Sequence, residues 1–198
     1  MKAVRRGVLV ATAFATLGLI SACGGGMGGM DHGSGASSAP AGANFNDADV
    51  MFAQMMIPHH QQAVQMATLA GTKASDPEIK QLAAQIKAAQ DPEIRTMSGW
   101  LTAWGQPSAA AGGHNMPGMS GMPGMMSEQE LTALSQASGA DFDRLFARGM
   151  IAHHNGAIQM AKDEQANGKN ADAKALAATI EKAQADEVTK LQKILDRL

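Results

Sequence analysis

The stretch Asp49-Val-Met-Phe-Ala-Gln-Met-Met-Ile-Pro-His-His-Gln-Gln-Ala-Val-Gln-Met-Ala67 is repeated 94 residues later, from Asp143 to Ala161. Eleven of the 19 aligned positions are identical, including the two adjacent histidines. The same offset continues without a gap to Glu93, which aligns with Glu187. Because chance does not maintain one offset across two segments, the chain contains an internal duplication.

Each repeat is predicted to form two packed helices, because residues of one face recur in alternating steps of three and four. The face of the first helix consists of Asp49, Phe52, Met56, His59, Ala63, Met66 and Ala70. A second helix is expected to begin at Asp76-Pro77, since Asp caps a helix and Pro is tolerated at its first position. Pro58 and Pro92 each remove a backbone hydrogen bond, so we expect a bend near each of them.

The pattern predicts an all-α fold. Two helical hairpins, 45–104 and 127–198, close most simply as a four-helix bundle with pseudo-twofold symmetry. We expect the first hairpin to turn at Gly71. Ser127 and Glu130 have the spacing of a capping box and predict a short helix leading into the second hairpin.

Two segments have the composition of linkers. Fourteen of the 22 Gly lie in residues 23–44 and 105–126, and five of the 15 Met lie in 116–126. Such segments contain too little apolar surface to form a core. We therefore expect a disordered tether over 23–44 and a Met-rich crossover loop over 105–126.

Residues 1–22 have the pattern of an export signal, with a basic start and an apolar run that is short for a membrane span. The run ends in Ile20-Ser21-Ala22-Cys23, which resembles the lipobox of bacterial lipoproteins. This resemblance implies that Cys23 carries a lipid and anchors the protein to the outer face of the cell membrane. A formal net charge of −2 and an aromatic content of 4% argue against a nucleic-acid partner.

Polar residues interrupt the predicted core at matching places in both repeats. His59 is expected to face the core, whereas His60, about 100° away around the helix, faces a neighbouring helix or the surface. Glu93 and Glu187 lie at the depth of the histidines, and a buried His or Glu needs a partner. Two interpretations stay open: a His–Glu hydrogen bond that fixes register, with Met as gap filler, or a copper site, because thioether and imidazole ligands together suit Cu(I).

The crossover loop carries a second group of candidate ligands. A Met occurs at every third position among Gly and Pro, which leaves the thioethers in water unless they bind an ion. A low-complexity linker is the alternative. The candidate ligands of the loop are His114, Met116, Met119, Met122, Met125 and Met126.

The motif Met-x-x-His-His-x-x-Ala-x-x-Met-Ala at 56–67 and 150–161, followed by Gln-x-x-Glu at 90–93 and 184–187, resembles the domain-of-unknown-function family 305 (DUF305). The resemblance covers about residues 45–198. It implies a ferritin-like fold and a place among extracytoplasmic copper-binding proteins that are rich in Met and His. The copper ligands that it implies are Met56, His59, His60, Met66, Met150, His153, His154 and Met160.

Three functions are compatible with the sequence. The first is a copper-binding lipoprotein that sequesters Cu(I) or hands it on to an unidentified protein partner, with its His sites weakening near a pKa of about 6.5. The second is a ferritin-like dimetal oxidoreductase, for which Asp49, Glu93, Asp143 and Glu187 are an irregular match to the usual carboxylate set. The third is an envelope scaffold that binds no metal.

Overall fold

The computed structural model describes residues 43–108 and 122–198, and in this part of the chain helices are the only regular elements. The helices are α1 (Asp47–Lys73), α2 (Pro77–Ala103), α3 (Glu128–Gln136), α4 (Gly139–Asn167) and α5 (Ala171–Leu195). Among these described residues, no helix has the length and apolarity needed to span a membrane. The predicted signal segment and Cys23 lie outside the described residues.

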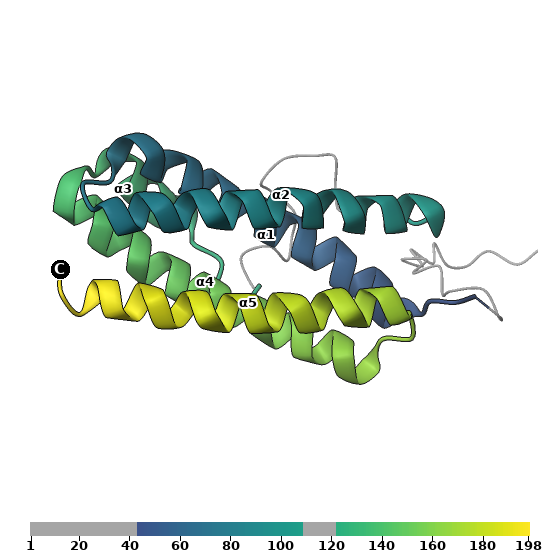
Figure 1. Ribbon diagram of the computed structural model, residues 1–198. Helices are drawn as coiled ribbons and strands as arrows, with labels where there is room; N and C mark the ends of the chain where they lie inside the picture. Colours follow the sequence, from purple (N-terminus) through teal and green to yellow (C-terminus); the bar gives the residue numbers. More distant parts are fainter. Residues whose placement is uncertain (1–42, 109–121) are drawn as a thin grey trace, which may run out of the picture. The chain divides into compact units, whose positions relative to one another are not determined.

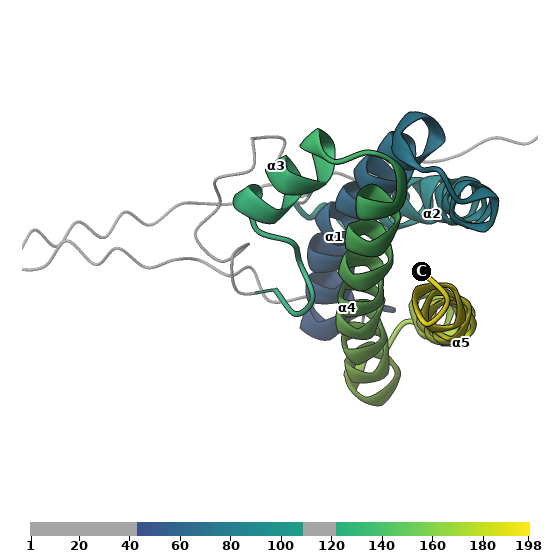
Figure 2. The same ribbon diagram turned by 90° about the vertical axis from the view of Figure 1, so that its left-hand side faces the viewer.

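The long helices form two hairpins that pack on each other. α1 packs along α2 and α4 packs along α5, while α1 also packs on α4 (Figure 1). The short α3 lies on the side of α1 and α4 that faces away from α2 and α5 (Figure 2). The prediction of an all-α four-helix bundle made of two hairpins is confirmed.

Side-chain caps start the helices where the sequence predicts them. Asp76 caps α2 by accepting hydrogen bonds from the amides of the first turn, and Pro77 occupies the first helical position. Asn170, 94 residues later, caps α5 in the same way. Ser127 and Glu130 form the predicted capping box of α3, with both reciprocal hydrogen bonds present.

The end of α1 and the two prolines inside helices differ in how they compare with the sequence. Gly71 does not end the first helix, because α1 continues to Lys73 and Ala74 is the first extended residue. The expected turn at Gly71 is therefore wrong, and its position is set instead by hydrogen bonds that Asp143 makes to the residues after Ala74. Both Pro58 and Pro92 lie inside uninterrupted helices, so a bend at either one stays a prediction.

Reciprocal carboxylate bonds fix how the hairpins dock. Asp143 at the start of α4 accepts hydrogen bonds from the amides of Ser75, at 3.1 Å, and Asp76, at 2.9 Å, in the first hairpin's turn. Asp49 at the start of α1 accepts one of 2.9 Å from the amide of Asn170 in the second hairpin's turn. α1 and α4 therefore run antiparallel, each beginning against the other hairpin's turn. All seven residues predicted for the packed face of α1 are buried.

Methionines occupy the core on both sides of the point where α1 and α4 meet. One cluster of buried apolar residues contains Met66 and Met150, and the other contains Met56 and Met160. The offset of 94 makes Met56 equivalent to Met150, and Met66 equivalent to Met160. Each cluster therefore contains one member of each equivalent pair. Burying such a side chain contributes about 1.5–3 kcal/mol, and the exchange of equivalent residues between clusters reflects the pseudo-twofold symmetry.

Candidate metal site

Two histidines meet at the centre of the bundle. The imidazole rings of His59 on α1 and His153 on α4 have centroids 3.7 Å apart and planes inclined by 38°. Both residues are fully buried. Because they occupy the same position in the two repeats, the bundle brings the duplicated histidine into contact with its own copy.

The second histidine of each pair contacts a carboxylate on the partner helix of its own hairpin. His60 Nε2 lies 2.8 Å from Glu93 Oε2 on α2, and His154 Nε2 lies 2.7 Å from Glu187 Oε2 on α5. The histidines are fully buried, while the two carboxylate side chains are 16% and 14% exposed. Of the two orientations expected for His60, the structure has the one facing a neighbouring helix.

Burial keeps the central imidazoles uncharged. It lowers the pKa of His59 to about 3, with a further decrease from nearby His60 and a partial increase from its bond to the Pro123 carbonyl. Burial and the proximity of His59 hold the pKa of His153 well below its ordinary value of 6.5. Neutral imidazole is the form that binds metals. His59 and His153 therefore stay neutral to a lower pH than a free imidazole, and the weakening of metal binding by acid stays a prediction.

Most of the buried polar side-chain atoms that lack a hydrogen-bond partner lie in this central layer. They comprise Nδ1 of His59, His60, His153 and His154, Nε2 of His153, both amide atoms of Gln90 and Oε1 of Gln184. A buried polar atom without a protein partner costs about 1–3 kcal/mol, and such atoms in a native protein commonly bind an ion or water. The layer therefore has the donors for a bound cation.

Residues 122–126 lie directly over the histidine contact. The Pro123 carbonyl accepts a hydrogen bond of 3.2 Å from His59 Nε2. The side chain of Gln62 accepts from the Met126 amide at 2.8 Å and donates to the Met126 carbonyl at 3.0 Å. Gly156 makes the close approach feasible, because a Cβ there would lie 1.9 Å from the Pro123 carbonyl oxygen. These residues form a cover, called here the 122–126 segment.

The sulfur atoms of this segment are not all in water, contrary to the expectation for the loop. Met122 is 9% exposed. Met126 packs against α4 with Met66, since a Cβ on Gly149 would lie 2.9 Å from Met126 Sδ and 3.3 Å from Met66 Cε. Packing against the bundle gives these methionines a structural use that composition could not reveal. Met125 is half-buried.

The remaining predicted ligands are distributed as follows. Met56, Met66 and Met150 are fully buried and Met160 is 7% exposed. The loop residues predicted as ligands but lying outside the described residues are His114, Met116 and Met119. In residues 43–108 and 122–198, no three His, Cys, Asp or Glu side chains form a group that could hold a metal ion. A metal held by this layer therefore needs thioether ligands in addition to the imidazoles.

The carboxylates expected for a dimetal site are not brought together. Asp49 and Asp143 bond the backbone of the opposite hairpin turns. Each lies ten residues from the nearest histidine of the motif, which is about 15 Å along a helix. Sequence reasoning missed this role because the bonded partners lie 67–121 residues away in the chain.

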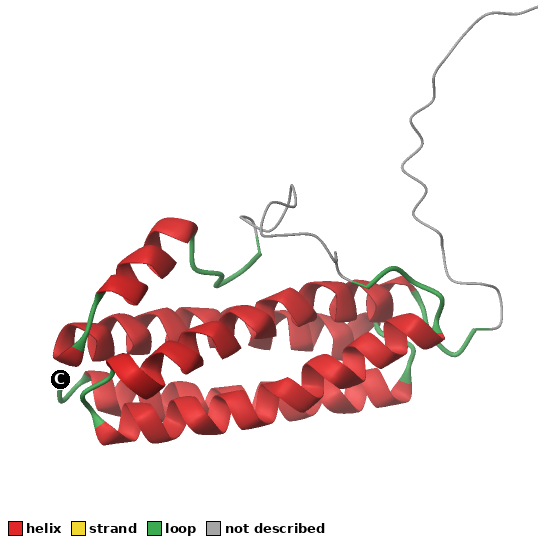
Figure 3. Ribbon diagram, turned by 90° about the horizontal axis from the view of Figure 1, so that it is seen from above, coloured by secondary structure: helices red, strands yellow, loops and turns green. Residues whose placement is uncertain are grey.

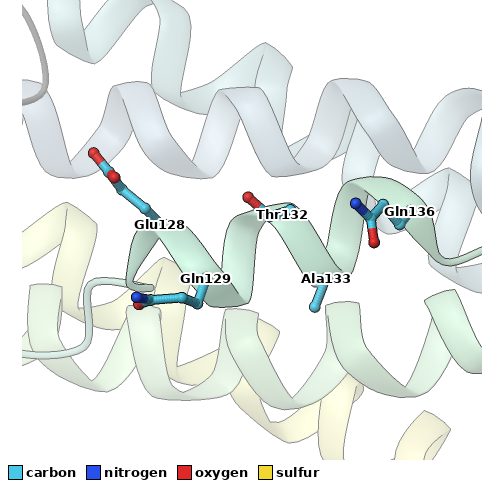
Figure 4. A pocket seen from close by; sticks show the side chains of 5 residues that line it. All are labelled: Glu128, Gln129, Thr132, Ala133 and Gln136. Carbon is cyan, nitrogen blue, oxygen red and sulfur yellow. The ribbon is translucent and has the colours of Figure 1, made fainter.

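Two surface pockets were not anticipated. The first, of about 380 Å³, is lined only by residues of α3, namely Glu128, Gln129, Thr132, Ala133 and Gln136 (Figure 4), and it contains no His or Met. The second, of about 240 Å³, lies between α1 and α4 and includes Met51, Met55 and Met160. The spacing of Met51 and Met55, four residues apart on one helix face, is the signal that could have pointed to it.

Comparisons with known proteins place the chain in a family. The model of the family described as a domain of unknown function, DUF305, matches residues 49–195. Among curated proteins, none matches the chain. A DUF305 fragment from Deinococcus radiodurans is 32% identical, with a TM-score of 0.69 over 77% of this chain and 97% of that one.

Two further solved structures are similar. A DUF305 protein from Streptomyces coelicolor, described as secreted, is 30% identical, with a TM-score of 0.68 over 76% of this chain and 91% of that one. CopM in its Cu(II)-bound form is 36% identical, with a TM-score of 0.65 over 75% of this chain and 96% of that one. CopM has also been solved with Cu(I) and with silver. With the family model covering both repeats, the chain belongs to the DUF305 family.

Proposed function

We propose that this protein is an extracytoplasmic copper-binding protein that sequesters Cu(I) or hands it on through imidazole and thioether ligands. The observation that carries the proposal is the buried contact of His59 with His153, whose rings lie 3.7 Å apart with ring nitrogens left unpartnered. Two neutral imidazoles from different hairpins supply two nitrogen donors in a space closed to solvent. Similarity to CopM, which has been solved with Cu(I) and Cu(II), supports copper as the ion.

Thioethers complete the donor set. Met56 precedes His59 by three residues and Met150 precedes His153 by three, so each methionine lies one turn before a histidine on the same helix face. Imidazole and thioether together favour Cu(I) over hard cations such as Mg²⁺. Met66 and Met160 lie about two turns beyond the histidines and serve as outer donors during entry or transfer.

The contacts of His60 with Glu93 and of His154 with Glu187 place a carboxylate between the central layer and solvent. A carboxylate attracts a cation electrostatically and orients the imidazole that it contacts. In this proposal the two glutamates guide the ion inward from opposite hairpins. The Met-rich residues 114–126 capture ions before they reach the bundle, and a lipid on Cys23 holds the protein at the membrane.

A competition titration tests the central site. The full chain is titrated with Cu(I) against a Cu(I) chelator and compared with His59→Phe/His153→Phe, which keeps two aromatic rings in place but removes their nitrogens. We expect the affinity to fall by more than about 100-fold, the upper range for changes to groups that only support a ligand. Thermal unfolding of both proteins verifies that the variant is folded.

Met97→Leu is the matched control. It replaces a buried core methionine that is not among the predicted ligands, so Cu(I) affinity should be unchanged. A variant lacking residues 114–121 separates the loop from the bundle, because it retains the 122–126 segment over His59. Equal Cu(I) affinity in wild type and His59→Phe/His153→Phe would refute the proposed centre.

A further inference from the structure

The outer face of α1 and α4, turned away from α2 and α5, has two unlike halves. One half is covered by α3 (Figure 3). Leu131 of α3 and Met126 pack against the buried core cluster there, together with Leu69 of α1. These contacts shield the apolar surface of this half from solvent.

The other half contains the pocket of about 240 Å³. Its lining residues are Ala48, Met51, Phe52 and Met55 of α1 and Met160, Asp163, Glu164 and Asn167 of α4. In the part of the chain that the structure describes, no helix covers this half (Figure 3). Met51 is 58% exposed, so the pocket opens to solvent beside its thioether.

The symmetry-related positions lack the same chemistry. The counterparts of Met51 and Met55, 94 residues later, are Leu145 and Gly149. The counterpart of Glu164 is Ala70. The combination of three thioethers with a carboxyl group therefore belongs to one half of this face, and apolar packing common to both repeats does not explain it.

A buried carboxyl group lines the same pocket as these thioethers. Glu164 is 1% exposed and lies among the lining residues. Burial, followed by a side-chain hydrogen bond with Asp49, raises the pKa of Glu164 to about 8. Release of this proton gives a carboxylate in the pocket wall, and a cation in the pocket would offset the cost of burying that charge.

We propose that this pocket binds a soft monovalent cation of the Cu(I) or Ag(I) class through Met51, Met55 and Met160, with Glu164 balancing the charge. Thioethers select such cations and bind hard ones poorly. The site extends the proposed copper function, on which it rests for the identity of the ion, but it shares no ligand with His59 and His153. Its rim is open to solvent through Met51, whereas the central histidines are closed.

Silver is the probe for the test, because it binds thioethers and does not change oxidation state during the titration. The full chain, labelled with ¹³C at the methionine methyl groups, is titrated with Ag(I) while stoichiometry is measured by calorimetry. We expect the methyl signals of Met51, Met55 and Met160 to shift together. In Met51→Leu/Met55→Leu, one equivalent of bound Ag(I) should be lost.

Leucine keeps the size and apolarity of the pocket and removes only the sulfur. Met97→Leu is the matched control, since Met97 is a buried methionine that does not line the pocket, and it should retain the full stoichiometry. Unshifted methyl signals, or unchanged stoichiometry in Met51→Leu/Met55→Leu, would overturn the proposal.

The His59→Phe/His153→Phe variant distinguishes the two sites. If the proposed pocket is real, this variant keeps the shifts of Met51, Met55 and Met160 and loses only the equivalent bound at the centre. Unshifted signals of Met51, Met55 and Met160 in the wild type refute the pocket. Equal Ag(I) stoichiometry in the wild type and in His59→Phe/His153→Phe refutes the copper centre, and a wild type that binds no Ag(I) refutes both.

Discussion

The two repeats use the same residues for docking and different residues for their outer faces. Asp49 and Asp143 make matching bonds to opposite hairpin turns, and His60–Glu93 and His154–Glu187 are matching contacts. Outside this shared frame, the first repeat has Gln62 where the second has Gly156. Gly156 admits the Pro123 backbone, while Gln62 bonds Met126.

Duplication therefore accounts for the matching contacts that dock the hairpins. Divergence at a few outer positions makes the two halves of the outer face different. The 122–126 segment can pack in only one of the two symmetry-related ways. Gly156 of the second repeat leaves room for the segment's backbone, and Gln62 of the first repeat forms hydrogen bonds with it. As a result, one half of the outer face is covered by α3 and the other half keeps a pocket.

The largest effect should come from removing a docking carboxylate. Asp49→Ala and Asp143→Ala should each lower the free energy of unfolding by about 3 kcal/mol, because buried amides lose their acceptor. Urea denaturation of the protein without metal measures both values. Equal losses agree with a symmetric frame, whereas a loss near zero for one of them would show that its bonds do not hold the hairpins together.

A smaller loss is expected where the 122–126 segment crosses α4. Gly156→Ala should lower the free energy of unfolding by about 2 kcal/mol, since a Cβ would overlap the Pro123 carbonyl and force overpacking. Gly71→Ala is the matched control: nothing lies within 4 Å of its Cβ position inside α1. There the substitution should raise stability by about 0.5–1 kcal/mol. If both substitutions stabilise the protein, the segment does not pack as described.

The pH dependence of stability should separate the central layer from the pocket. The pKa of His59 falls from 6.5 to about 3 on folding, so the unfolded chain binds the extra proton and stability decreases as pH falls below 6.5. The pKa of Glu164 rises from 4.5 to about 8, so its contribution is present below pH 4.5 and is lost as pH rises towards 8. Each group gives a slope of at most about 1.4 kcal/mol per pH unit.

Below pH 6.5, His59 and His153 both make the free energy of unfolding increase with pH. Their combined effect is larger than the opposite effect of Glu164. Without metal, stability should therefore be greatest near pH 6.5. Urea titrations at several pH values measure the curve. Glu164→Gln should abolish the decline above pH 6.5 and leave the acid limb unchanged; a decline that persists in this variant would assign it to another group.

Much of the fold could be predicted from the sequence because it depends on local signals. The offset of 94, the packed face from Asp49 to Ala70 and the caps at Asp76 and Ser127 each indicate an element without knowledge of its neighbours. The His60–Glu93 contact was also predictable, since counting back from the hairpin turn places both at one depth. These signals lie within a single hairpin.

The features that sequence reasoning missed depend on contacts between hairpins. The bond from Asp143 to the turn after Ala74 sets where α1 ends, and no local rule near Gly71 contains it. The pocket appears only when Met51 and Met55 of α1 lie beside Met160 of α4. The burial of Met122 depends on the small residues of α4, whereas composition alone favours exposed thioethers for such a loop.

The central claim is that His59 and His153 bind one cuprous-class ion between them. ¹⁵N spectra of the histidine rings during titration with Ag(I) test it most directly, because ligated nitrogens shift and couple to silver. The account predicts that ring nitrogens of both His59 and His153 shift and show this coupling at the same equivalent of Ag(I). Ag(I) bound at that stoichiometry with both rings unshifted would contradict it.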